Sequence, residues 1–395
     1  MTVTDPAPST AEAGALHFGL GEELSLVQDA AREFADGVLA PLATKHDREE
    51  TISDDVYRQL GELGFWGLTL PEEYGGAGMG NVALAVVLEE LNRACAATGV
   101  AVSVHNSLLC APLMKFGTDA QKTHWLPKLA SGEAIGAYSL SEAGSGSDAA
   151  ALAATATRDG DEWVLNGTKL WVTSGDRAGL FLIYLRSDPD VPKAKGITAF
   201  LVPGDAPGLK VGKHEMKTGI RGSATVEIIL DNVRVGADAV LGEVDRGFPI
   251  AMDTLAGGRI GIASQAVGIG QACLDASVKY AMEREQFGKP IGHFQAIQHK
   301  IADMSARLEA ARLLVRKAAW MRDQGMEVNR PSSEAKLLAS QAANFAADET
   351  LQIHGGAGYT DHFHVERLFR DARITEIYEG ATDIQRLVIA RSLLR

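Results

Sequence analysis

The 395-residue sequence has few cysteines, few aromatic residues and no excess of basic charge. Its cysteines, Cys95, Cys110 and Cys273, are isolated, and no CxxC pair or Cys/His cluster indicates a structural zinc site or a redox dithiol. We therefore expect no metal, and we expect these thiols to be small buried groups in a reducing compartment. Aromatic residues make up only 6%, which favours close helix packing over a β-sandwich of large side chains.

The charge and hydropathy patterns exclude two classes of partner. The formal net charge is −13, and an acidic chain gains nothing from counterion release at a phosphate backbone, so we expect no nucleic acid partner. We also expect no membrane partner, because no apolar stretch is long enough to span a bilayer; Ser264 and Gln265 interrupt the run at 260–273. Residues 1–16 contain no Lys or Arg and fit neither a secretory signal nor a transit peptide, which indicates a disordered tail on a cytoplasmic protein.

Hydrophobic periodicity divides the rest of the chain into three zones. Residues 17–133 and 247–395 have helical spacing of apolar residues, whereas residues 134–246 contain short β-forming runs between turns. No helices alternate with these strands, so a parallel βαβ sheet is excluded. The expected fold class is α+β, mostly α, with an N-terminal helical domain, a central antiparallel β domain and a C-terminal helical bundle.

Local signals predict individual helices. Amphipathic helices are expected at 22–38, 54–63 and 82–97. Pro331 is expected to begin a helix that ends at Gly355-Gly356. The helix before it has an apolar seam with alternating spacings of four and three, typical of a bundle: Ile297, Ile301, Met304, Leu308, Ala311, Val315 and Ala318.

The clearest β signal predicts a hairpin. Asn166-Gly167 separates the β-forming runs at 163–165 and 169–172, and both residues tolerate a positive φ. Further strands are predicted at 181–185, 199–202 and 224–230.

Two segments of the β zone could form a ligand site. Residues 138–148 form a loop rich in hydroxyls and glycines, which can offer backbone N–H groups to a polar ring or a phosphate, although a plain turn has the same composition. The match of 144–149 to the dinucleotide motif G-x-G-x-x-A is rejected, because a hairpin follows it instead of a helix and a parallel strand. Trp171 and Thr173 share a strand face and could cover an aromatic cofactor and hydrogen-bond its edge; a core Trp beside an edge Thr is the alternative.

A series of motifs in one order carries a resemblance. The motifs are PEEYGG (71–76), LSEAGSGSD (140–148), LNGTKLWVTSG (165–175), GIRGS (219–223), REQFG (284–288), QIHGG (352–356) and IYEG (377–380). The series covers essentially all of the chain after the tail and resembles the acyl-CoA dehydrogenase family, with the short-chain, butyryl-CoA branch most similar at 258–265 and 370–376. The resemblance implies a β-barrel or sandwich as the middle domain, a C-terminal four-helix bundle, bound FAD and oxidation of the Cα–Cβ bond of an acyl-CoA thioester.

The resemblance also implies a mechanism, in which the α proton goes to a base and the β hydrogen goes as hydride to flavin N5. Glu379 matches the family's catalytic base, and desolvation would raise its pKa towards a useful value. The thioester carbonyl would be held by the Glu379 backbone N–H and a ribityl hydroxyl of FAD. Some members carry the base immediately before Arg259, but Gly258 stands there in this chain and cannot accept a proton. Taken alone, Glu379 could also be an acidic residue favoured near a helix N-terminus.

Binding residues follow from the same resemblance. The flavin ring and pyrophosphate would contact Tyr138, Leu140, Ser141, Gly146, Ser147, Trp171 and Thr173, with Thr382 and Asp383 also binding FAD. The adenosine end would bind across a subunit interface to Arg284, Phe287, Gln295, Gln352, Gly355 and Gly356. The substrate would contact Ser147, Arg259, Tyr378 and Gly380. Three residues depart from the family pattern: Ala143 replaces a Pro, Ala256 replaces an Asp that contacts the pantetheine arm, and Ala381 replaces a Thr whose FAD contact could pass to Thr382.

Finally, the resemblance implies partners. We expect an acyl-CoA substrate with a short, straight or singly branched chain, an electron-transfer flavoprotein as acceptor, and a homotetramer built as a dimer of dimers. The pathway would be fatty acid β-oxidation or branched-chain amino acid degradation. An oxygen-using, acyl-CoA oxidase-like flavoenzyme is the first alternative, although such oxidases are generally longer. A non-catalytic protein that binds FAD and CoA is the second, and the presence of Glu379 argues against it.

Overall fold

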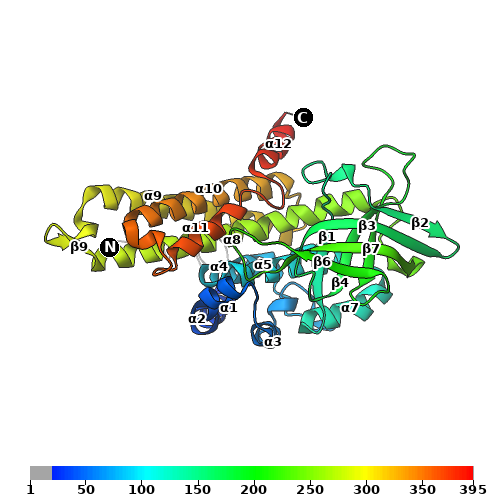
Figure 1. Cartoon of the computed structure of the whole chain (residues 1–395), viewed down its shortest axis with the longest axis horizontal. Helices are drawn as coiled ribbons and strands as arrows, with labels where there is room; N and C mark the ends of the chain where they lie inside the picture. The colour runs from blue at the N-terminus through cyan, green and yellow to red at the C-terminus, as the bar shows by residue number, and fades with distance from the viewer. Residues whose placement is uncertain (1–19, 395) are drawn as a thin grey trace, which may run out of the picture.

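The computed structural model describes residues 20–394, so the tail expected at 1–16 lies outside the described residues. Figure 1 shows long helices running side by side through the molecule, a β sheet at one end and the N-terminal helices along one side. The long helices are α8 (Gly247–Glu283), α9 (Gln295–Asp323) and α10 (Asn329–His354), and the shorter α11 (Val365–Ile374) packs against α8 and α10. This is the bundle expected from the C-terminal periodicity.

The apolar seam of α9 is the contact between these helices. The members of the seam from Met304 onwards are buried, namely Met304, Leu308, Ala311, Val315 and Ala318. Ile297 and Ile301, near the start of the helix, are partly buried. Helix α10 begins two residues before Pro331, a position where proline is tolerated because the first turn has no intrahelical acceptor for its N–H. It ends at Gly355, as expected.

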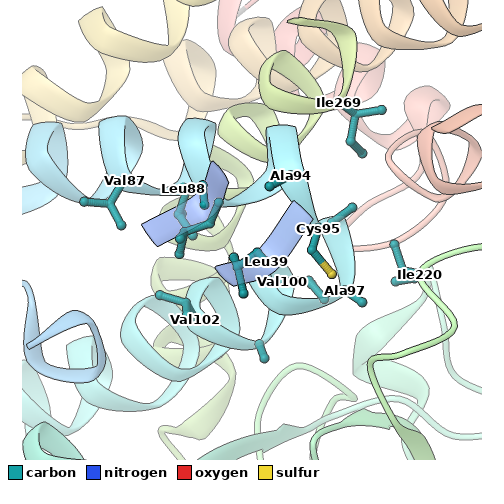
Figure 2. Packing of buried hydrophobic residues seen from close by; sticks show 14 of the residues in the cluster. Leu39, Val87, Leu88, Ala94, Cys95, Ala97, Val100, Val102, Ile220 and Ile269 are labelled. Atoms are coloured by element: carbon teal, nitrogen blue, oxygen red, sulfur yellow. The ribbon is translucent and has the colours of Figure 1, made fainter. Parts of the chain in front are cut away.

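The N-terminal region contains more helix than the periodicity predicted. The helix expected at 22–38 continues, because α1 (Glu22–Phe34) runs through a π-helical turn (Ala35–Leu39) directly into α2 (Ala40–Glu49). The chain then forms α3 (Asp54–Glu62), α4 (Gly80–Ala94), α5 (Ala96–Val104), α6 (Ala111–Phe116) and α7 (Asp119–Ser131). Figure 2 shows the core in which Val87 and Leu88 of α4, Val100 of α5 and Ile269 of α8 lie together. This core fixes α4 and α5 against the bundle.

One segment corrects the expectation drawn from hydropathy. Helices α5 and α6 are joined by a π-helical turn into a single run, Ala96–Phe116, that is long and apolar enough to cross a bilayer by length and composition. The statement that no stretch is long enough was therefore wrong. Most of the run is buried inside the protein, in contact with α4, α8 and the sheet, as a core helix is.

The sheet of the middle region is mixed, whereas an antiparallel one was predicted. Its strands are β1 (Ile135–Ser139), β2 (Thr155–Asp159), β3 (Glu162–Thr173), β4 (Ala178–Arg186), β5 (Ile197–Pro203), β6 (Leu209–His214), β7 (Thr225–Gly236) and β8 (Val240–Leu241). The order is β6-β7-β3-β2-β4-β5-β8, with β1 beside β4. The pairs β1–β4 and β2–β4 are parallel. The β2–β3 hairpin lies between β1 and β4 in the sequence, and β4 then runs in the same direction as β1. The other pairs are antiparallel.

The predicted Asn166-Gly167 hairpin does not form. Both residues lie inside the continuous strand β3, where the pairing with β7 shifts register between Leu165 and Gly167. Gly167 has φ 137°, and an added Cβ would overlap the backbone and side chain of Ala154, so the glycine allows a β-bulge against a close neighbour. The turn is at Gly160 instead, which has φ 64° and joins β2 to β3.

Candidate functional site

Glu379 lies on the turn between α11 and α12 (Thr382–Leu393). Its φ is 48°, and the next residue, Gly380, has φ 94°, so two consecutive residues occupy the left-handed region. For a glutamate this conformation costs about 1–3 kcal/mol, and it persists only where the surroundings determine it. Such strain concentrates at functional sites, so the turn is a candidate site on backbone geometry alone.

The Glu379 carboxylate points at helix α8. Its Oε2 atom is buried and has no hydrogen-bond partner among the described residues. A Cβ added at Gly258 would overlap this Oε2 and lie 2.7 Å from Cδ2 of Leu108. Gly258 therefore leaves room for the carboxylate, and the two alternative positions for a base considered from the sequence meet at one point in space.

Burial raises the pKa of Glu379 to about 7, and the positive charges of Lys336 and Arg259 oppose this rise. A carboxyl group with such a pKa is partly ionised at neutral pH, so it can accept a proton and release it again. Sequence reasoning identified Glu379 and Arg259 but missed Lys336. In the sequence Lys336 is a single basic residue in a helix, which usually indicates a solvated side chain.

The raised pKa predicts how the rate depends on pH. Any reaction in which Glu379 accepts a proton needs the ionised carboxylate, so kcat/KM should fall as the pH is lowered through about 7. For a carboxylate of ordinary pKa the fall would come near pH 4.5. A kcat/KM profile from pH 5.5 to 8.5 measures this, and a rate that stays constant down to pH 5.5 would show that the base does not have a pKa near 7.

Arg259 is buried on α8 and is only 5% exposed. Its guanidinium lies 3.5 Å from Oδ1 of Asn329 and 3.4 Å from Oγ of Ser333, and burial lowers its pKa while the charge of Glu379 raises it. The structure thus brings Arg259 of α8 close to Glu379, and its guanidinium also lies beside two side chains of α10. Its expected contact with CoA stays a prediction.

Two tyrosines approach Glu379 from different elements. The Tyr378 hydroxyl donates a hydrogen bond to Oε1 of Gln265. Gln265 is a fully buried residue of α8, and its side-chain amide donates to the Ala96 carbonyl at 3.1 Å. Tyr138 comes from β1, and burial and the charges of Tyr184 and Glu379 raise the pKa of its phenol. The site therefore joins the bundle to the β sheet.

The loop after β1 is anchored by a buried ion pair. Glu142 accepts hydrogen bonds from Nζ of Lys169 at 2.6 Å and from the backbone N–H groups of Ala153 and Ala154. Lys169 is fully buried and also donates to the Leu140 carbonyl at 3.2 Å. The Ser141 carbonyl accepts from Leu170 N–H, which fixes the start of the loop beside β3. Ala143 stands next to Glu142 without disturbing this anchor.

The rest of this loop is open, which suits a ligand. Gly146 and Ser147 are exposed, and a Cβ added at Gly144 or Gly146 would meet no described atom within 4 Å. A ligand can approach the loop backbone closely at these points. Leu140, in contrast, is buried in the core beneath the loop.

Trp171 lies at a register shift of β3. Its φ is 58°, and the pairing of β3 with β7 skips from Lys169 to Val172, so regular alternation does not hold here. The buried Val172 lies between Trp171 and Thr173, neither of which is buried, and their sharing of one strand face stays a prediction. The indole is 55% exposed while Thr173 is half-buried, so the indole is free to cover a flat ligand.

A second group of expected cofactor residues lies at the other end of the bundle. Figure 1 shows the short strand β9 (Glu285–Gln286) at the far end of α8 from the sheet. The residues are exposed there: Arg284, Phe287, Gln295, Gln352, Gly355 and Gly356. With a rise of about 1.5 Å per residue, the segment of α8 from Gly258 to Arg284 spans roughly 40 Å. Within one chain, therefore, these residues and Glu379 are too far apart to hold the two ends of one FAD molecule.

Two of the residues that depart from the family pattern, Ala256 and Ala381, have polar neighbours on their own helices. Ala256 is buried, and Asp253, one helical turn earlier, pairs with Lys115 at 2.6 Å. Ala381 caps α12 without a side-chain hydrogen bond, while the Thr382 hydroxyl donates to the Glu376 carbonyl at 3.2 Å. Asp383 is exposed in the first turn of the same helix.

Comparisons with known proteins cover nearly the whole chain. Three family models match: the N-terminal domain of acyl-CoA dehydrogenase at residues 21–133, its middle domain at 137–233 and its C-terminal domain at 245–394. The chain is 47% identical over 376 residues to the mitochondrial short-chain specific acyl-CoA dehydrogenase of Homo sapiens, an alignment covering 95% of this chain and 91% of that protein.

Solved structures agree with the sequence matches. Butyryl-CoA dehydrogenase from Megasphaera elsdenii superposes with a TM-score of 0.94 at 38% identity, covering 96% of this chain and 100% of that one. A chain from the structural study of the electron-transferring flavoprotein of Acidaminococcus fermentans superposes with a TM-score of 0.95 at 40% identity, with the same coverage.

Proposed function

Because this chain belongs to the acyl-CoA dehydrogenase family and is therefore an FAD-dependent oxidoreductase, we propose that it converts short acyl-CoA thioesters to trans-2-enoyl-CoA. Electrons would pass to an electron-transfer flavoprotein. One observation supports the proposal above the others: the buried Oε2 atom of the Glu379 carboxylate has no hydrogen-bond partner in the described chain and faces the space left by Gly258.

The α hydrogen of a thioester is a weak acid, so its removal needs a base and a way to stabilise the enolate oxygen. Glu379, with its pKa raised to about 7, is suited to accept that proton. Its own backbone N–H donates to no acceptor within residues 20–394, and so it is free to donate to the thioester oxygen. One residue thereby supplies both the base and an oxyanion donor.

The residues at the sheet end of the site suit FAD, whose flavin supplies the acceptor for the β hydride when bound. The open loop at Gly144 and Gly146 leaves its backbone accessible to a polar ring or a phosphate. The exposed indole of Trp171 can cover one face of a flat ring. The side chain of Tyr138, near Glu379, would keep water away from the reacting atoms.

The distance along α8 supports a shared cofactor site. Arg284 and the exposed Phe287, 93% accessible, would bind the adenosine end of a cofactor whose flavin lies against a second copy of the chain. We propose on this basis that two copies of the chain share each cofactor site, and from the family resemblance that the protein is a homotetramer, assembled as a dimer of dimers.

Helix α8 suggests why the acyl chain should be short. Gly258 and Gly261 leave one face of the helix without side chains, and Gln265 follows one turn later on the same face, about 10 Å from Gly258 by helix rise. Gln265 is fixed by its hydrogen bonds with Tyr378 and the Ala96 carbonyl. An acyl chain extending from Glu379 along this face would pass the side chains of Leu108 and Ser103, which lie against Gly258 and Gly261, and would end against the Gln265 amide.

Replacing Gln265 with alanine should therefore admit longer chains. Each additional buried methylene contributes about 0.8 kcal/mol, so two methylenes would change the ratio of kcat/KM for hexanoyl-CoA to that for butyryl-CoA by roughly tenfold. Steady-state kinetics with C4 to C16 acyl-CoAs measure this ratio. Gln271→Ala is the matched control, since Gln271 lies on the same helix but hydrogen-bonds to Asp275 and Arg312 at the surface, and it should leave the ratio unchanged. An unaltered ratio in Gln265→Ala would mean that this residue does not limit chain length.

The proposed reaction is tested with FAD-loaded protein under anaerobic conditions. Butyryl-CoA should bleach the flavin absorbance and yield the trans-2-enoyl thioester in equal amount. Isobutyryl-CoA and 2-methylbutyryl-CoA in the same assay decide between straight and branched chains. Reoxidation by electron-transfer flavoprotein without peroxide supports a dehydrogenase, whereas stoichiometric peroxide from oxygen would establish the oxidase alternative.

A further inference from the structure

Lys336 is a buried cation that the proposed reaction does not use directly. It lies on α10 and is 0% exposed. Its Nζ donates to the carbonyl oxygen of Thr375 at 3.0 Å and to that of Gly380 at 2.9 Å. A lysine is almost never fully buried without such partners, because removing the ammonium from water is costly.

The two acceptors bracket Glu379. Thr375 lies at the end of α11 and Gly380 follows Glu379, so one ammonium group joins both ends of the turn to α10. Gln385 of α12 donates to the same Gly380 carbonyl at 2.7 Å, and the Thr382 N–H donates to the Glu376 carbonyl at 2.9 Å. These ties hold Glu379 in its left-handed conformation, which it would otherwise leave.

We infer that Lys336 is a positioning residue for the base: its ammonium holds the turn that carries Glu379 against Gly258, and its charge favours the ionised carboxylate. This inference rests on the proposed function for its kinetic part. Lys336 donates to the backbone carbonyls of Thr375 and Gly380, which flank Glu379 in the sequence, so we expect it to act on substrate through Glu379.

The charges that face Glu379 come from three packed elements and from the turn itself. Arg259 on α8 and Lys336 on α10 are the cations, and Tyr138 on β1 and Tyr378 on the turn are neutral phenols at neutral pH. Glu376 acts on Lys336 as a further negative charge. Burial lowers the pKa of Lys336 to about 8, still above that of Glu379, so near pH 7 the lysine is mostly charged while the base is partly ionised.

Three substitutions separate charge from hydrogen bonding. Lys336→Arg keeps the charge, Lys336→Gln keeps two N–H donors without charge, and Lys336→Met keeps the length of the side chain without either. Loss of an opposite charge raises the pKa of a carboxyl group, here by about one unit. The acid limb of kcat/KM should therefore move from about pH 7 to about pH 8 in Lys336→Gln and Lys336→Met, a roughly fivefold loss of rate at pH 7. Lys336→Arg should keep the limb near pH 7.

The matched control is Ser340→Ala, one turn further along α10, where the buried hydroxyl bonds, among the described residues, only to the Leu337 carbonyl of its own helix. It should retain the wild-type pH profile. A purely structural lysine would lower the active fraction, measured as bound flavin per chain, without moving the limb. An unmoved limb in both uncharged variants would overturn the inference.

Hydrogen exchange tests the anchoring without any substrate. In Lys336→Met the backbone amides at 376–385 should exchange at least tenfold faster than in the wild type, and in Lys336→Gln by less. Exchange that is unchanged in Lys336→Met would overturn the positioning role even if the protein acts on another substrate. Conversely, the amides could exchange faster in Lys336→Met while the folded wild type does not oxidise acyl-CoA. That result would refute the proposed function and leave the anchoring role of Lys336 intact.

Discussion

Replacing Glu379 with glutamine should lower the rate of flavin reduction by butyryl-CoA by roughly 10²–10⁴-fold, the usual contribution of a general base. Glutamine has the same shape as glutamate, so it fits the space beside Gly258, but its amide cannot accept the α proton. Stopped-flow absorbance of the flavin under anaerobic conditions measures the rate. A variant that reduces its flavin at the wild-type rate would rule out Glu379 as the base.

The same variant has a stability signature that shows whether the site is intact. The pKa of Glu379 is raised in the folded state from 4.5 to about 7. Folding therefore favours the protonated form: the favourable contribution is fully present below pH 4.5 and is lost as the pH rises through 7. Glu379→Gln should melt at a higher temperature than the wild type at pH 8 and at the same temperature near pH 4.5. Retention of bound FAD at both pH values serves as the control for folding.

Replacing Gly258 with alanine should lower the rate of the chemical step by about 10²-fold, with little change in bound FAD. The added methyl would overlap both Oε2 of Glu379 and Cδ2 of Leu108, so the carboxylate has to move. A displacement of about 1 Å is enough for such a loss when proton transfer needs close alignment. The loss should appear in kcat with a larger isotope effect from α-deuterated substrate, since proton abstraction becomes slower.

Gly37→Ala is the control for that experiment. Gly37 also lies within a helical run, but a Cβ added there meets no described atom within 4 Å, so the variant should keep the wild-type rate. Wild-type kinetics in Gly258→Ala would mean that the Glu379 carboxylate does not occupy the position against α8.

The parts of the fold that the sequence predicted well are those with long periodic signals. The seam on α9 and the glycine end of α10 depend on spacing within one helix, and local spacing survives folding. The Asn166-Gly167 prediction failed because Gly167 serves a tertiary need, the close approach of Ala154, that no local pattern reveals. The parallel pairing of β1 with β4 is likewise a long-range feature.

The candidate site divides in the same way. The order of the motifs identified Glu379, and the residue lies on a turn just before the last helix, as the motif implied. The role of Gly258 as the space for the carboxylate and the presence of Lys336 could not be predicted, because both depend on α8, α10 and the turn meeting in space. A lysine between Ala335 and Leu337 has no local mark that distinguishes a buried anchor from a solvated side chain.

The central claim is that Glu379 takes the α proton, and exchange of that proton with solvent tests it most directly. FAD-loaded protein is reduced beforehand so that hydride transfer is blocked, and butyryl-CoA is then incubated with it in D₂O. We predict that the wild type introduces deuterium at the α carbon, detected by mass spectrometry, and that Glu379→Gln does not. Deuterium incorporation by Glu379→Gln at the wild-type rate would contradict the account.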